Sequence, residues 1–446
     1  MAFRIFERLF VIAFLLLSMQ VAVGLTSPDE TEDDPTVAVG QVHVLHAVLE
    51  VGVDLCGVLL IVLRWRRMLH AVRAVWPLVG LVGLAALSTA WSAQPDITFR
   101  RSALLVLTTV LAIYLGERYS IEEQARLLAH TFCLMISAIF ILYFLAPGYV
   151  IDHGSHPGAW KGLSAHKNSL GEYMAIAVLL LLLVRFSQFR WLRYVFLVAA
   201  TVLLLLSQSA ASVVCCAVFI AAMPLWRSAQ LRGKQRLALC AMAVSFLFAG
   251  LCFMATSSDR LLHLLGRNAT LTGRTQLWPA IGHAIMNRPI LGYGYDTFWI
   301  NSGGEALGIR AGAGWLVHLA DNGFLDLGLS LGLLGVGLFF LIFALSFRNG
   351  IGYLKLEPGS LGLWPISYFC FFLLHNVTES TLLARGGFSC LLFVALTTGL
   401  ALRSKEVLAD VAVDTFYGDF EFFPTHPEIP SGFTTADDIL RDLGTE

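Results

Sequence analysis

The stretches GRTQLWPAIGHAIMNRPILGYGYDTFWI (273–300) and GWLVHLADNGFLDLGLSLGLLG (314–335) form the longest polar and aromatic interruption in an otherwise apolar chain. Ionisable groups gathered in a membrane protein usually serve a function, so chemistry is sought here first. The alternative is a surface loop whose arginines bind lipid headgroups. The region 273–335 as a whole holds Arg274, Arg288, Arg310, His283, His318, Asp296 and Asp321.

The composition places the chain among membrane proteins. Of its 446 residues, 57% are hydrophobic and 14% are charged, whereas soluble domains average about 25% charged residues. A net charge of −1 leaves no basic surface to neutralise phosphates, which excludes a nucleic-acid partner. The eight cysteines lie in apolar runs and show neither metal-ligand spacing nor a disulfide framework.

The apolar runs predict an all-α polytopic membrane protein with about twelve transmembrane helices. Lys and Arg concentrate in alternate connections, which predicts that both termini lie in the cytoplasm. Residues 1–403 are expected to form the membrane domain, and the acidic segment 404–446 a largely disordered cytoplasmic tail. The runs lie near 9–26, 42–63, 74–91, 103–116, 128–147, 169–184, 194–206, 211–226, 237–255, 323–345, 361–375 and 387–402.

Two external loops, at about 148–168 and 256–320, are expected to form the active site, the longer one between the ninth and tenth spans. In the first loop His166, Lys167 and Asn168 precede a helix N-terminus, where cationic and amide donors favour an anion. Its histidines match no zinc spacing, so no metal is expected. In the second loop TQLWPAIGHAIM predicts a short helix in the membrane interface.

The start of the tenth span carries closely spaced polar side chains. His318, Asp321 and Asn322 are spaced i, i+3 and i+4, so a helix that includes them would place them on one face. Asp326 would extend that polar stripe into the membrane. Glycines at positions 328, 332 and 335 are expected to let another helix approach closely.

Five motifs follow one another in an order that resembles the O-antigen ligase and exopolysaccharide polymerase superfamily, most closely its ExoQ-like members. They are GLSAHKNSLG, GRTQLW, NRPILGYGYDTFW, DNGFLDLGLSLGLLG and HNVTES, and the resemblance covers roughly residues 80–400. It implies a bacterial inner-membrane glycosyltransferase with a periplasmic active site. Such an enzyme transfers glycans from undecaprenyl pyrophosphate to a sugar hydroxyl without metal or cofactor. The implied partners are the lipid-linked glycan, a glycan or lipid acceptor, membrane lipids, and flippase and chain-length or export proteins.

The resemblance also assigns roles to residues. Arg274 matches the essential arginine of the family and Arg288 is the second choice, because a guanidinium binds phosphate oxygens. His318 is the leading candidate for the base that takes the acceptor proton, and Asp321 competes with it. The remaining expected substrate-binding residues are Arg310, His166, Lys167, Asn168, Tyr293, Tyr295, Trp299, Asn322 and Glu379, whose aromatic members either stack on sugars or anchor the interface.

One departure concerns the turn SQSAAS (207–212). Many relatives carry Arg or Lys there, so one phosphate contact is either missing or supplied by Lys167, Arg310 or Arg101.

Three functions remain under consideration. The first is an exopolysaccharide polymerase that joins lipid-linked repeat units. The second is an O-antigen-type ligase that passes a finished glycan to a lipid or protein acceptor, which the same motifs would serve. A secondary transporter is less favoured, because the halves show no repeat and the ionisable groups lie in external loops.

Overall fold

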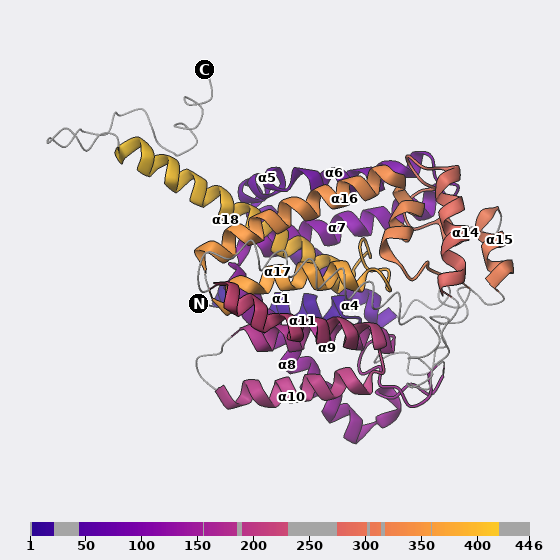
Figure 1. Cartoon of the computed structure of the whole chain (residues 1–446), viewed down its shortest axis with the longest axis horizontal. Helices are drawn as coiled ribbons and strands as arrows, with labels where there is room; N and C mark the ends of the chain where they lie inside the picture. The colour runs from indigo at the N-terminus through magenta and orange to yellow at the C-terminus, as the bar shows by residue number, and fades with distance from the viewer. Residues whose placement is uncertain are drawn as a thin grey trace, which may run out of the picture.

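The computed structural model describes residues 2–21, 44–154, 156–184, 190–230, 274–300, 304–313, 317–357 and 359–418. Within these ranges the chain is helical and forms no β-strand, with one isolated bridge between Ile151 and Trp160 (Figure 1). The α-helices are α1 (Ala2–Ser18), α4 (Val44–Leu63), α5 (Trp65–Ala74), α6 (Trp76–Leu87), α7 (Pro95–Arg118), α8 (Ile121–Leu145), α9 (Lys167–Leu183), α10 (Arg190–Leu206), α11 (Ala210–Gln230), α14 (Arg274–Asn287), α15 (Glu305–Ala313), α16 (Gly323–Leu356), α17 (Ser360–His375) and α18 (Phe388–Gly418).

The apolar runs account for most of these helices. Each predicted run within the described residues coincides with a helix, while the run at 237–255 lies outside them. Among the helices that the structure describes, three (α7, α8 and α16) are long and apolar enough to cross a bilayer, and α5 with α6 forms a fourth candidate bent by 92°. The count of about twelve spans, and which side each end faces, stay predictions. The helix α18 continues past Arg403 to Gly418, and residues 419–446 lie outside the described residues.

The centre of the bundle is α17. A helix that is apolar on all sides belongs inside a bundle, and Trp364, Tyr368 and Phe371 of α17 are all completely buried. This helix packs against α9, α11, α16 and α18. Helix α18 also packs along α7, where a Cβ on Gly116 would lie 2.5 Å from Thr398. Close approach at small residues is how helices associate in lipid, where hydrophobicity alone gives no preference.

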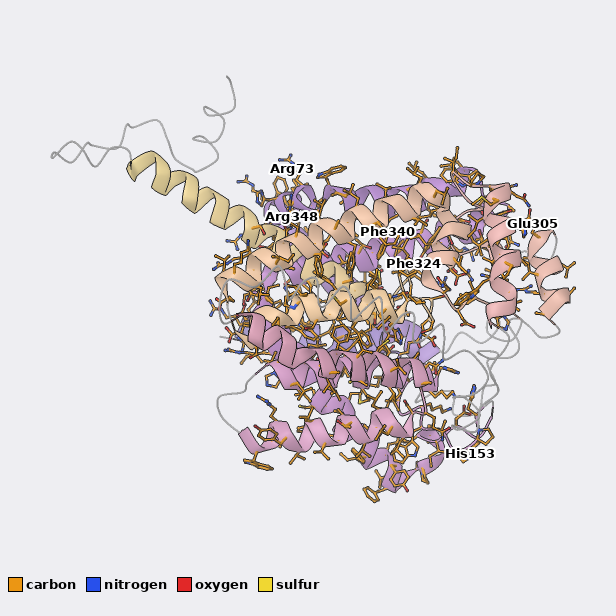
Figure 2. All side chains as sticks on the ribbon, viewed as in Figure 1. Arg73, His153, Glu305, Phe324, Phe340 and Arg348 are labelled. Carbon is orange, nitrogen blue, oxygen red and sulfur yellow. The ribbon has the colours of Figure 1, made fainter. Side chains whose placement is uncertain are left out.

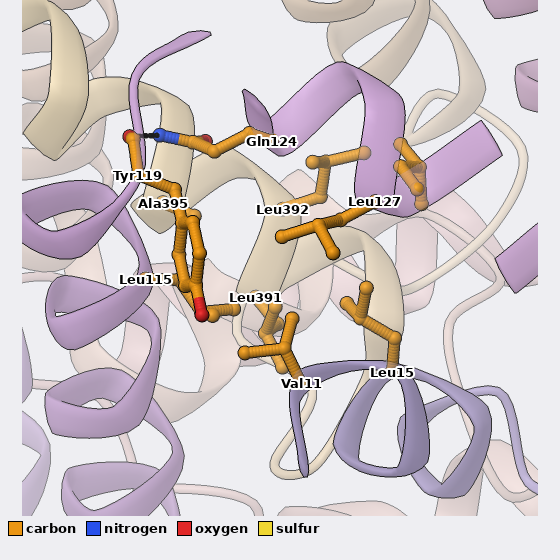
Figure 3. A pocket seen from close by; sticks show the side chains of 10 residues that line it. Val11, Leu15, Leu115, Tyr119, Gln124, Leu127, Leu391, Leu392 and Ala395 are labelled. Carbon is orange, nitrogen blue, oxygen red and sulfur yellow. Dashed lines mark hydrogen bonds between the residues drawn. The ribbon is translucent and has the colours of Figure 1, made fainter. Parts of the chain in front are cut away.

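A small apolar cavity lies between α1, α7, α8 and α18 (Figure 3). Its volume of about 20 Å³ is roughly the room that one water needs. Its walls are almost entirely leucine, valine and alanine side chains, with Gln124 donating to the Tyr119 carbonyl 2.8 Å away. The glycan pyrophosphate that the resemblance implies would be both larger and far more polar than this space, so we do not expect it to bind in this cavity.

Helix α16 is broken at Gly332, whose φ of 65° and ψ of −167° are not helical. The segment 289–294 fills the break and pairs its backbone with both halves of the helix. Tyr293 N–H donates to the Leu329 carbonyl at 2.8 Å, and Leu333 N–H donates to the Pro289 carbonyl at 2.7 Å. The backbone groups that the break releases are therefore satisfied by a loop rather than by water.

Glycines make this insertion possible. A Cβ on Gly332 would lie 2.3 Å from the Ile290 carbonyl oxygen, and one on Gly292 would lie 2.5 Å from the Leu329 carbonyl oxygen. Gly328 does face a helix, because its Cβ position is 3.0 Å from Ile285 of α14. The expectation that all three α16 glycines admit another helix is thus wrong at Gly332, where backbone from a loop enters instead. It is also wrong at Gly335, whose Cβ position meets only Leu331 of α16 itself.

Candidate functional site

Segments far apart in the sequence meet at one end of the bundle, which we call the site end and define by Asn168, Asn322 and Glu379. The Asn168 amide Nδ2 donates to Glu379 Oε1 at 3.0 Å, although 211 positions separate the two residues. The Asn322 amide Nδ2 donates to the Val377 carbonyl at 3.1 Å. The starts of α9 and α16 are therefore tied to the turn that follows α17.

Asn322 is the N-cap of α16. Its Oδ1 accepts from the backbone N–H groups of Phe324 at 3.0 Å and Leu325 at 3.2 Å, which would otherwise lack partners. The helix consequently begins at Gly323, and His318 and Asp321 precede it. The expectation that His318, Asp321 and Asn322 share a helical face is wrong, because a strong cap starts the helix after them. Asp321 instead adopts a left-handed φ of 49°.

Asp326 organises the segment just before α16. Its carboxylate accepts from Trp299 Nε1 at 2.8 Å, from the Ala320 N–H at 3.0 Å, and from the Ser380 hydroxyl. A carboxylate in the first turn of a helix is also favoured by the helix dipole. Its i+4 spacing from Asn322 predicted Asp326 as an extension of the polar stripe, but not as a residue that holds the segment before the helix.

His318 lies in a segment that is held on both sides. The Trp278 indole of α14 donates to the Ala320 carbonyl at 3.1 Å, and Arg310 Nε of α15 donates to the Val317 carbonyl at 3.0 Å. A second Arg310 nitrogen donates to the Trp299 carbonyl. Arg310 thus holds the loop closed through backbone oxygens, a different use from the expected phosphate contact. His318 and Asp321 are both half-buried.

Arg288 follows α14, and its side chain is exposed. Its Cζ lies 4.9 Å from the ring centroid of Tyr293, in cation–π geometry. The Tyr293 hydroxyl donates to Glu305 Oε2 at 2.7 Å, and burial together with this carboxylate raises the pKa of the phenol well above its usual value. The ring therefore stays neutral and keeps its face for the guanidinium (Glu305 is labelled in Figure 2).

A chain of aromatic rings connects Arg288 with Asp326. The Tyr293 and Phe298 centroids are 4.9 Å apart and those of Phe298 and Trp299 are 5.0 Å apart, both edge to face. Arg274 is the first residue of α14, and its side chain lies outside the described ones. The helix predicted from TQLWPAIGHAIM is confirmed as α14.

Tyr295 and Trp299 are buried, with 3% and 8% of their surfaces exposed. The Tyr295 hydroxyl donates to the Leu383 carbonyl at 2.5 Å, and its backbone N–H donates to Ser88 Oγ at 2.9 Å. Burial raises the pKa of the Tyr295 phenol well above its usual value. Both rings anchor the loop in this structure rather than offering a flat face to a sugar, whereas Tyr293 is only half-buried.

Asp296 binds two arginines at once. Arg101 of α7 lies 3.3 Å from its carboxylate, and Arg385 of the turn after α17 forms an ion pair with the same oxygen. The Asp296 φ of 55° is left-handed, which the two charge-assisted contacts help to hold. Arg101 is therefore engaged by the protein, and Arg385 is a site-end residue that sequence reasoning assigned no role.

The first external loop ends in α9, which begins at Lys167 with His166 as its N-cap. His166 Nδ1 accepts from the Asn168 N–H at 3.2 Å, and Lys167 is 6% exposed. Among the described residues, no group of three His, Cys, Asp or Glu side chains is placed to hold a metal ion.

The turn 207–209 joins α10 and α11 and lies within the turn predicted at 207–212. Ser207 and Ser212 are completely buried, and Ser212 Oγ lies 3.3 Å from His375 Nε2 at the end of α17. His375 Nδ1 in turn lies 3.4 Å from Glu172 of α9. The three serines pack inside the bundle and support the turn that carries Glu379, so a long cationic side chain would not fit at positions 207, 209 or 212.

Two comparisons with known proteins bear on this geometry. A family model described as O-antigen ligase matches residues 194–340, which include α14, the segment 288–300 and the break in α16. The chain is also 25% identical over 307 residues to the exopolysaccharide production protein ExoQ of Rhizobium meliloti (strain 1021), covering 64% of this chain and 68% of that protein. Both findings support the superfamily that the order of motifs indicates.

Proposed function

We propose that this chain, as an ExoQ-like member of the O-antigen ligase superfamily, is an exopolysaccharide polymerase. It transfers glycan repeat units from undecaprenyl pyrophosphate to a sugar hydroxyl at the periplasmic face of the bacterial inner membrane. The two sequence matches support a glycan-processing function of the ligase or polymerase type in a multi-pass membrane enzyme. The lipid carrier, the polymerase role and the membrane side rest on the resemblance of the motifs.

The convergence at the site end is the observation that carries this proposal. Asn168, Asp326 and Glu379 come from three different motifs and are joined by direct hydrogen bonds or through Ser380 and the backbone. Carboxylates and amides are the groups that recognise sugar hydroxyls, since they accept and donate in fixed directions. Motifs that are far apart in the sequence thus meet in one cluster of polar side chains in space.

The reaction needs a leaving-group site and a proton acceptor. The acceptor hydroxyl oxygen bonds to the anomeric carbon while the bond from that carbon to the pyrophosphate oxygen breaks. The electron pair of the broken bond passes to the pyrophosphate, whose charge Arg288 and Arg274 stabilise. The hydroxyl proton goes to His318, with Asp321 as the competing base.

A ligase uses the same chemistry on a finished glycan, and the family model that matches residues 194–340 is described by that activity. It is therefore the second candidate. The break in α16 is also a feature of secondary transporters, in which discontinuous helices line a substrate cavity. Here the segment 289–294 fills the break and satisfies its backbone, so the break opens no such cavity.

The test is a profile of lipid-linked and surface glycans in a strain that lacks the gene, complemented with wild type, Arg274→Ala or Arg100→Ala. Arg100 is an exposed arginine of α7 and serves as the matched control. A polymerase predicts single repeat units on the lipid and no high polymer with Arg274→Ala, and a wild-type profile with Arg100→Ala. Full-length chains retained on the carrier would indicate the ligase. A normal profile from a well-expressed Arg274→Ala protein would contradict the leaving-group assignment.

A further inference from the structure

Helix α5 crosses the end of the bundle opposite to the site end. It meets α6 at 92°, with the junction at Val75. It packs on α7 and α18 where α7 ends, and Arg64, just before α5, pairs with Glu117 at 3.2 Å. Figure 1 shows α5 at the edge of the helices, beside the end of α6. Because α7 is a candidate span, α5 lies near the level at which that span leaves the bilayer.

The side chains of α5 divide into three sectors around its axis. Met68 and Ala71 are buried against the bundle. Trp65 and Leu69, one turn apart, are exposed apolar residues with 56% and 47% of their surfaces accessible. The third sector is basic and exposed and consists of Arg66, His70 and Arg73, spaced i, i+4 and i+7.

This arrangement fits the boundary between acyl chains and headgroups. An exposed tryptophan and leucine lose contact with water if they enter the acyl region, and tryptophan favours the interface. The neighbouring basic sector then lies at the depth of the phosphates. The Arg66 guanidinium lies 5.4 Å from the Trp65 ring centroid, so the cation and the aromatic anchor reach the same level.

We propose that α5 is a docking surface for anionic phospholipid, with Arg66 and Arg73 binding headgroup phosphates and with Trp65 and Leu69 entering the acyl chains. Arg64 is neutralised by Glu117, and Arg67 lies 3.9 Å from the same carboxylate. Within the described part of the chain, Arg66 and Arg73 make no ion pair, so their charges are available to a lipid. Figure 2 shows Arg73 at the outer edge of the bundle in that view.

The experiment measures lipid binding to the purified full chain in neutral detergent by native mass spectrometry. Dioleoyl phosphatidylglycerol and dioleoyl phosphatidylcholine are titrated against wild type, Arg66→Ala/Arg73→Ala, Arg66→Lys/Arg73→Lys and Arg100→Ala. Each arginine near an anionic surface strengthens binding by about fivefold. The alanine pair is therefore expected to bind phosphatidylglycerol on the order of 25-fold more weakly. The lysine pair and Arg100→Ala should stay close to wild type.

Three controls test whether the effect requires the anionic headgroup, whether the variants are folded, and whether the site takes free phosphate instead of lipid. Phosphatidylcholine should bind all four proteins equally, and equal melting temperatures without added lipid show that the variants are folded. Added inorganic phosphate should leave phosphatidylglycerol binding unchanged, and displacement by phosphate would mean that the site takes the free anion instead. Unchanged phosphatidylglycerol affinity in the alanine pair, or no preference for phosphatidylglycerol in wild type, would overturn the proposal.

Discussion

Replacing Gly332 with alanine should displace the segment 289–294 from the break in α16. The Gly332 backbone (φ 65°, ψ −167°) lies in a region that is essentially restricted to glycine, and a side chain there costs about 1–3 kcal/mol. The new Cβ would also lie 2.3 Å from the carbonyl oxygen of Ile290 and 2.4 Å from its carbonyl carbon. Because both atoms belong to the backbone, no rotamer change relieves the contact, and the segment 289–294 must withdraw.

Withdrawal breaks hydrogen bonds between that segment and α16, including the one from Leu333 to Pro289, each worth about 0.5–1.5 kcal/mol. Wild type loses the same bonds when the segment opens, so they do not change the balance between closed and open segment from one protein to the other. The strain at residue 332 and the contact with Ile290 destabilise the closed segment alone, and a strain of about 3 kcal/mol shifts the balance toward the open segment on the order of a hundredfold. Arg288 and Tyr293 move with the segment, so polymer formation should fall as well.

The assay is amide hydrogen exchange of the purified protein in micelles, read on peptides that cover residues 288–300 and 329–335. Gly332→Ala should exchange on the order of a hundredfold faster there than wild type. Gly337→Ala is the matched control in the same helix, because its Cβ would meet nothing within 4 Å and alanine is the better helix former. If Gly332→Ala and Gly337→Ala exchange at the same rate, the inserted segment does not depend on Gly332 and the reasoning fails.

Two further predictions concern the start of α16. Asn322→Ala should lower the free energy of unfolding by about 1 kcal/mol through loss of the cap, measured by thermal unfolding in micelles. Asn322→Asp should recover most of this because it keeps the accepting oxygen, and a wild-type melting temperature for the alanine variant would argue against the cap. His318→Ala should cause a severe loss of polymer and Asp321→Asn a smaller one, scored by surface glycan in a complemented strain. Near-normal polymer from His318→Ala would transfer the role of base to Asp321.

The sequence predicted the helices whose formation depends on the apolar pattern of their own residues. The apolar runs predicted the helices, and TQLWPAIGHAIM predicted α14 inside a polar stretch. The spacing of His318 and Asn322 misplaced the start of α16, because periodicity does not weigh the capping preference of asparagine against continuation of the helix. The pairing of Asp296 with Arg101 and Arg385 joins positions 195 and 89 residues apart, and no feature of the chain near Asp296 announces either partner.

The placement of the arginines bears on which one would bind the pyrophosphate of the proposed substrate. Two nitrogens of Arg310 donate to backbone carbonyls, and Arg101 pairs with Asp296. If either arginine moved toward a ligand, a partly buried acceptor would lose its hydrogen-bond partner. Arg288 is exposed, stacked on a neutral ring, and joined through Phe298 and Trp299 to the carboxylate that holds the His318 segment. Of the described arginines in the long polar stretch, Arg288 can therefore bind phosphate with the least rearrangement. This makes the resemblance-based choice of Arg274 and the geometric choice of Arg288 complementary, since a pyrophosphate presents two phosphoryl groups to be held.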